Sequence, residues 1–130
     1  MGQIMLNGNI YTGGEVHADV HYSTNEQIVG TWIDGSTVYE KVVDLGTLPN
    51  ATTKNVAHGI SNLGILVSAD FSAYDSQGYR FTFPYTVVDR NYFGYQVSVS
   101  LDTTNIIIVT DADRSAYSGY AILRYTKALA

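Results

Sequence analysis

Apolar and polar side chains alternate with a period of two along most of the chain. The pattern runs through residues 65–74 and 97–101, and it recurs in 79–85, where every second side chain is aromatic: Tyr79, Phe81, Phe83 and Tyr85. Because successive side chains of a β-strand point to opposite faces, these stretches predict strands with one apolar face.

Two further stretches complete the strand pattern. Residues 105–110 (NIIIVT) form a short continuous apolar run, which predicts a strand covered on both faces. Residues 117–126 place Ala121, Leu123 and Tyr125 on one side of a last strand. No segment has helical periodicity, so we expect an all-β chain.

Turn residues separate these strands. Asp34-Gly35 lies between two apolar runs and predicts a hairpin with a type I′ turn. Residues 75–78, 102–105 and 111–115 have turn composition as well. Strands of this length and spacing predict an antiparallel β-sandwich or a small jelly-roll-like domain.

The chain divides into two parts by composition. Residues 1–21 are rich in glycine and contain only short apolar pieces, and we interpret them as an N-terminal attachment arm. Residues 22–130 form the β-sandwich module. The N-terminus lacks the basic region and apolar core of a signal peptide, so we expect synthesis and assembly in the cytoplasm of the producing cell.

Charge narrows the choice of partners. The formal net charge is -5, and the seven Lys and Arg residues are scattered along the sequence. Nucleic acid and anionic membrane surfaces are therefore not expected partners. No apolar run approaches the roughly 18 residues that a membrane span needs, so membrane insertion is not expected.

Candidate chemistry is sparse. There is no cysteine, and His17 and His21 would lie roughly 13 Å apart on a strand, too far to share a metal ion. Asp102, Asp111 and Asp113 fit solvated turn carboxylates better than a calcium site, because the EF-hand pattern is absent. We expect no metal, no cofactor and no catalytic residue, and hence no enzyme.

Tyrosine is the strongest compositional signal, with eleven residues in 130. Tyrosine offers apolar area with a polar tip and suits interfaces and sugar contacts. Candidate interface or glycan-contact residues are Trp32, His58, Tyr79, Tyr85, Tyr92, Tyr95, Tyr117 and Tyr120. Of these, Tyr79, Tyr85, Tyr92 and Tyr95 are expected on one surface, and Tyr117 and Tyr120 on another.

His58 stands in the stretch NVAHGISNLG, beside Gly59. It lies where a polar segment leads into the strand near Ile65, and we interpret it as a hydrogen-bonded structural histidine near a subunit contact. A pH-sensitive role at an interface is the alternative, since histidine titrates near neutrality.

An ordered series of motifs carries a family resemblance over about residues 22–127. It consists of HYSTNEQIVGTWIDGSTVYEKVV, LPNATTKNVAHGISNL, FPY and TNIIIVTDADRSAYSGYAILRYTK. The series resembles the β-rich C-terminal module of fibre and baseplate-type structural proteins of tailed bacteriophages and prophages. None of the motifs is catalytic.

The resemblance implies a non-enzymatic virion structural protein, a homotrimer that forms a fibre head or a surface decoration on the tail or head. Residues 1–21 would then attach the module to another virion protein. One alternative is a receptor-binding tip that recognises host cell-surface glycan through Tyr and Trp. The last alternative, a polysaccharide hydrolase, needs a cleft with two facing carboxylates.

Overall fold

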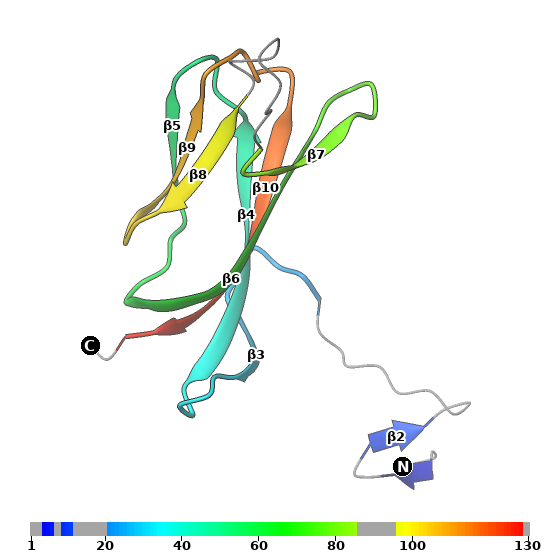
Figure 1. The fold of residues 1–130 in the computed structure, drawn as a ribbon. Coiled ribbons are helices and arrows are strands. Elements are labelled where there is room, and N and C mark those ends of the chain that lie inside the picture. The colour runs from blue at the N-terminus through cyan, green and yellow to red at the C-terminus, as the bar shows by residue number, and fades with distance from the viewer. Residues whose placement is uncertain (1–3, 7–8, 12–20, 86–95, 129–130) are drawn as a thin grey trace.

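The computed structural model describes residues 4–6, 9–11, 21–85 and 96–128 (Figure 1). Within these residues every regular element is a β-strand, and there is no helix, which confirms the all-β prediction. The strands are β1 (Ile4–Leu6), β2 (Asn9–Tyr11), β3 (Gln27–Thr31), β4 (Thr37–Thr47), β5 (Thr53–Ala57), β6 (Leu63–Tyr74), β7 (Arg80–Phe83), β8 (Val97–Leu101), β9 (Asn105–Thr110) and β10 (Ser118–Lys127).

The strands form three antiparallel sheets. The largest has the order β3-β4-β10-β6-β7, the second has the order β5-β9-β8, and β1 pairs with β2 in a small sheet of its own. The five-stranded and three-stranded sheets face each other (Figure 1), which confirms the predicted β-sandwich. β10 lies at the centre of the larger sheet because it pairs with both β4 and β6.

The core lies between the two facing sheets. Ala121, Leu123 and Tyr125 point into it from β10, as the sequence pattern predicts, and all three are fully buried. The three-stranded sheet contributes Val97, Ile106 and Ile108. Full burial of a valine, leucine or isoleucine side chain contributes roughly 1.5–3 kcal/mol to stability. The contact between the two sheets is therefore the main source of stability.

The three-stranded sheet covers only part of the larger one. In Figure 1, β3 and the first half of β4 extend below β5, β8 and β9. Across this uncovered end the register aligns Ile28, Tyr39, Tyr125 and Leu66 on the inner face. Ile28 is 67% exposed and Leu66 40% exposed, so an apolar row continues beyond the closed core.

A β-bulge changes the predicted face of β6. Ala69, Phe71 and Ala73 face the core as expected, but the pairing with β10 shifts between Arg124 and Tyr125. A bulge adds a residue to one strand, so side chains beyond it no longer follow the strict alternation. Leu66 therefore stands opposite Tyr125, whereas Ile65, predicted on the core face, is 48% exposed.

β9 differs from its prediction in a related way. Ile106 and Ile108 are buried, but Val109 is 41% exposed. The outer face of the three-stranded sheet has no further described layer over it, so the expectation of a strand covered on both faces is wrong. The apolar run reflects β-propensity on the second face rather than burial there.

The two predicted hairpins are present, but their turns are not type I′. Gly35 N–H donates to the Trp32 carbonyl, Trp32 N–H donates to the Ser36 carbonyl, and only Gly35 of this loop has a positive φ, at 91°. A type I′ turn needs positive φ at both central residues, so this is the three-residue loop closed by a left-handed glycine. The loop from Asp75 to Tyr79 has the same bonds, with Gly78 at φ 92°.

Candidate functional site

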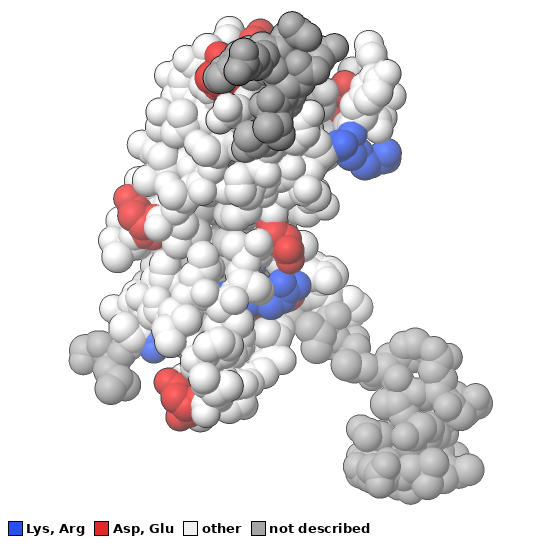
Figure 2. Space-filling model, viewed as in Figure 1, with Lys and Arg blue, Asp and Glu red and all other residues white. Residues whose placement is uncertain are grey.

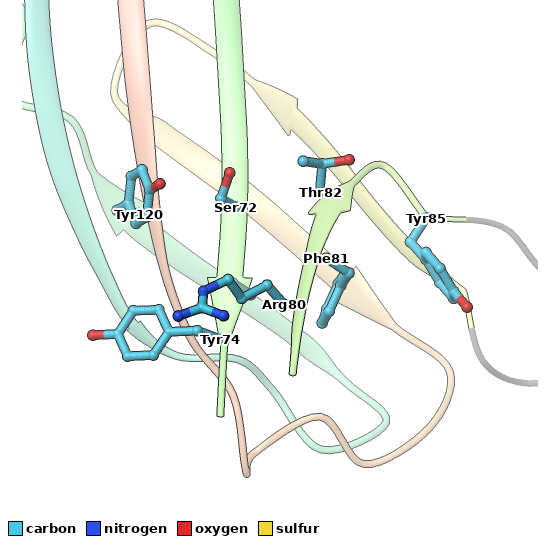
Figure 3. Close-up of a pocket in the computed structure, with 8 residues that line it drawn as sticks. Ser72, Tyr74, Arg80, Phe81, Thr82, Tyr85 and Tyr120 are labelled. Carbon is cyan, nitrogen blue, oxygen red and sulfur yellow. The ribbon is translucent and has the colours of Figure 1, made fainter. Parts of the chain in front are cut away.

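A hollow opens on the outer face of the five-stranded sheet, where β10, β6 and β7 run side by side. Ala73, Phe71 and Phe83 point into the core, so the alternate side chains of β6 and β7 point outward. The hollow has a volume of about 590 Å³. It is lined by Ser72, Ala73, Tyr74, Arg80, Phe81, Thr82, Tyr85 and Tyr120 (Figure 3).

Strand register fixes the arrangement of these side chains. Tyr120 on β10 pairs with Ser72 on β6, and Ser72 pairs with Thr82 on β7. In the next row Tyr74 pairs with Arg80. Directly paired residues have Cβ atoms roughly 5 Å apart and diagonal neighbours roughly 7–8 Å apart, which makes Tyr120 and Tyr74 diagonal neighbours across the hollow.

The hollow exists because small side chains stand between large ones. Ser72 and Thr82 form a low floor, whereas Tyr120, Tyr74 and Arg80 rise beside it. Tyr74 is 50% exposed and Tyr120 is 38% exposed, so both rings present surface to solvent. Figure 3 shows Arg80 extending from β7 toward Tyr74, and Tyr85 on the far side of β7.

A second hollow of about 530 Å³ continues the first along the same strands. It shares Ser72 and Thr82 with the first and adds Ile122, Asp70 and Pro84 on the outer face. The two together form a groove along the outer face of β6. Among the described side chains that line it, only Asp70 is a carboxylate.

An ion network closes one end of this groove. Arg124 Nε lies 2.9 Å from Glu40 Oε2, and its Nη1 lies 3.1 Å from Asp70 Oδ2 and 3.2 Å from Ser68 Oγ. The hydrogen bond to Asp70, together with the charge of Glu40, raises the pKa of Arg124 above its ordinary value. Asp70 is therefore held as an ion-pair partner of Arg124.

His58 lies away from the groove, directly after the last residue of β5, and is fully buried. The Ile60 N–H donates to its Nδ1, and its Nε2 lies 2.9 Å from the Asp102 carbonyl oxygen. The first bond requires Nδ1 to accept, so the ring carries its proton on Nε2 and donates it to Asp102. This confirms a hydrogen-bonded structural histidine; its position near a subunit contact stays a prediction.

The turn aspartates accept backbone hydrogen bonds, as expected of turn carboxylates. Asp102 accepts from the N–H groups of Asn105 and Thr104, and these bonds lower its pKa. Asp113 accepts from the hydroxyl and N–H of Ser115, with the same effect on its pKa. Asp111 accepts from the Gln96 N–H.

The predicted tyrosines separate differently from expectation. Tyr85 and Tyr120 both border the hollow, but the Tyr85 ring packs against Phe81 with centroids 5.3 Å apart, on the same side as Tyr117. Tyr117 was grouped with Tyr120, but it packs edge-on against Phe81 with ring centroids 4.9 Å apart, on the inner side. Tyr117 lies just before the first residue of β10, and Tyr120 follows three positions later, so strand alternation sends the two rings to opposite faces.

Tyr79 and Trp32 do not line the groove. Tyr79 is 66% exposed at the β6–β7 turn, and Trp32 is half-buried at the β3–β4 turn. Tyr92 and Tyr95 lie outside the described residues, as does His17.

Sequence reasoning missed Tyr74, Arg80, Ser72 and Thr82 as site residues. All four are the outward-facing residues of the two alternating stretches that predict β6 and β7, and this alternation was the sequence feature that could have identified them. The residues meet only because β6 and β7 pair in this register, which no single strand pattern shows.

The described part of the chain holds no cluster of three or more metal-ligating side chains. That part of the chain also contains no helix long and apolar enough to cross a membrane. Comparison with known family models, curated proteins and solved structures finds no match for this chain.

Proposed function

We propose that this chain is a structural module displayed on the tail or head of a bacteriophage particle, without enzymatic activity of its own. The observation that carries the proposal is the ordered motif series over residues 22–127. Two residues of this series have structural roles: His58 joins two loops, and Tyr125 lies in the core. Mass spectrometry of purified particles tests the proposal, since a virion component is retained through purification.

The groove supports binding rather than hydrolysis. Glycoside hydrolysis uses two carboxyl groups on opposite sides of the scissile bond. The described residues give the groove one carboxylate, Asp70, and Arg124 already pairs with it. Incubation with host polysaccharide should therefore release no reducing ends.

We further propose that the module assembles as a homotrimer and is attached to another virion protein by residues 1–21. The apolar row at the uncovered end of the larger sheet supports self-association, because Ile28 and Leu66 lie beyond the closed core. Contiguous exposed apolar surface is typical of interaction sites. Analytical ultracentrifugation at micromolar concentration tests the assembly, and a strict monomer would overturn it.

The groove favours a second role, recognition of host cell-surface glycan by a receptor-binding tip. Exposed tyrosine rings offer flat apolar faces to sugar rings, and the nearby hydroxyls of Ser72 and Thr82 offer donors and acceptors. A glycan array probed with the multivalent protein tests this role. Binding to no glycan would leave the module as a decoration.

A further inference from the structure

Arg80 is the one described basic side chain that faces the groove without an ionic partner. Among the described residues its side chain donates a hydrogen bond to the carbonyl oxygen of Gly78, 3.0 Å away. It forms no ion pair with any carboxylate in residues 21–85 or 96–128. Figure 2 shows basic atoms beside β7 with mostly uncharged surface around them.

The other described cations also have partners within the chain. Lys41 donates to the His58 carbonyl, and Lys54 donates to the carbonyls of Leu45 and Thr47. Lys127 pairs with Glu26. Arg124 is held by Glu40 and Asp70, and Arg114 lies over the rings of Phe81, Tyr85 and Tyr117. Arg80, Lys41 and Lys54 thus have carbonyl acceptors and no ion pair among the described residues, and of these three only Arg80 lines the groove.

The described carboxylates near the groove form no ion pair with Arg80. Asp75 Oδ1 accepts the N–H groups of Gln77 and Tyr79 within the turn. Asp70 pairs with Arg124 at the other end of the groove. An incoming anion can therefore take the guanidinium, whose planar fork matches a carboxylate with two parallel hydrogen bonds.

We propose that the groove binds an acidic sugar chain, with a hexuronic acid carboxylate on Arg80 and the pyranose ring against Tyr74 or Tyr120. This inference rests on the proposed glycan-binding role and names its ligand class. The ring faces of the two tyrosines require a ligand with an apolar CH face of its own, which a pyranose has and a glycerol phosphate polymer lacks. The floor hydroxyls of Ser72 and Thr82 then meet the sugar hydroxyls.

The net charge of -5 predicts how this binding depends on salt. Attraction of an anion must come from Arg80 locally, since the chain as a whole repels it. Surface charges are screened over about 10 Å at 0.1 M salt. Affinity for the acidic sugar should therefore fall as NaCl is raised, whereas affinity for a neutral sugar should not.

The test titrates the full chain with tetragalacturonate and with the neutral oligosaccharide of the same length, followed by two-dimensional NMR and calorimetry. We expect tighter binding of the uronate, with shifted amide signals at Ser72 and Thr82. Arg80→Gln should weaken uronate binding about tenfold and leave neutral binding unchanged, because it removes one charge-assisted bidentate contact. Tyr120→Ala should weaken both ligands, and Tyr79→Ala, at an exposed tyrosine outside the groove, should weaken neither.

The outcomes separate the two proposals. Equal binding of both sugars with no effect of Arg80→Gln would overturn the acidic-sugar inference and keep glycan recognition. Binding of neither, at millimolar ligand and with the variants melting as the parent does, would overturn both. An Arg80-dependent preference for poly(glycerol phosphate) over the uronate would also overturn the inference, in favour of a phosphate ligand.

Discussion

The imidazole of His58 joins two loops that are far apart in sequence: its Nε2 lies 2.9 Å from the carbonyl oxygen of Asp102. The backbone strengthens the same junction, because His58 N–H donates to the Thr104 carbonyl. Lys41 Nζ in turn donates to the His58 carbonyl. The first two bonds fasten the loop after β5 to the turn between β8 and β9 within the three-stranded sheet, and the bond from Lys41 on β4 ties this junction to the larger sheet.

Replacing His58 with alanine should therefore destabilise the fold. The variant leaves the Ile60 N–H and the Asp102 carbonyl without their side-chain partner and opens a cavity in a fully buried site. We expect a loss of about 2–4 kcal/mol in the free energy of unfolding, measured by urea denaturation. Tyr79→Ala is the control at an exposed position. An unchanged unfolding midpoint for His58→Ala would show that the junction does not stabilise the fold.

Tyr125 offers a test of a single buried hydroxyl. Its oxygen lies 2.6 Å from Glu26 Oε2, and burial together with Glu26 raises the pKa of Tyr125, so the hydroxyl stays a donor. Tyr125→Phe keeps the ring and its packing against Tyr39 but removes the bond. We expect a loss of about 1.5–3 kcal/mol by chemical denaturation, as for a hydrogen bond to a charged group. Equal stability would show that the bond contributes nothing.

Glu26 makes stability depend on pH on the acid side. Partial burial by itself raises its pKa, but hydrogen bonds from Lys127 and Tyr125 outweigh this and hold the pKa below the ordinary 4.5. A carboxylate with a lower pKa in the folded state stabilises the fold above its unfolded pKa, and this contribution is lost as pH falls through the folded value.

Thermal unfolding from pH 7 to pH 3 measures this effect. We expect Glu26→Gln to be less stable than the parent at pH 7 and to lose less stability below about pH 4.5. Parallel pH profiles for the two proteins would exclude Glu26 as a source of the acid sensitivity.

Two glycines provide a matched pair for packing. A Cβ at Gly64 would lie 2.8 Å from Thr126 Oγ1 and 3.0 Å from the Ala128 nitrogen, whereas a Cβ at Gly30 would meet nothing within 4 Å. Gly64→Ala should therefore cost about 1–3 kcal/mol of stability through overpacking. Gly30→Ala should be close to neutral. Similar melting temperatures for both variants would mean that Thr126 and Ala128, at the end of β10, shift at little cost to accept the Cβ at position 64.

The exposed apolar row gives a prediction on assembly. Ile28→Ser and Leu66→Ser remove apolar surface at the uncovered end of the larger sheet, where both side chains are exposed in the single chain. We expect the double variant to sediment as a monomer with an unchanged melting temperature at low concentration. Val109→Ser, at an exposed residue of the other sheet, is the control. An assembled double variant would place the subunit contact elsewhere.

Strand existence could be predicted from this sequence because the strands follow a period of two. The interior side chains Phe71, Leu123 and Tyr125 lie on the face that the pattern indicates. The bulge near Val67 could not be predicted, because it arises from the pairing of β6 with β10 and not from either strand alone. The turn at Asp34-Gly35 was recognised, but its type depends on the φ of Asp34, which tertiary context sets.

The groove could not be predicted either, because it depends on how neighbouring strands pair. Tyr120 was named from composition, but its neighbours Tyr74 and Arg80 come from strands more than 35 residues earlier and meet it only through register. Ser72 and Thr82, ten residues apart in the sequence, form the floor of the groove because β6 and β7 pair them side by side.

Immunogold electron microscopy of purified particles, with an antibody against the sandwich module, tests whether this protein is a virion component. We expect label at a fixed place on the surface of the tail or head, lost when the gene is deleted and restored by complementation. Particles that carry no label and yield no peptides of this chain would contradict it.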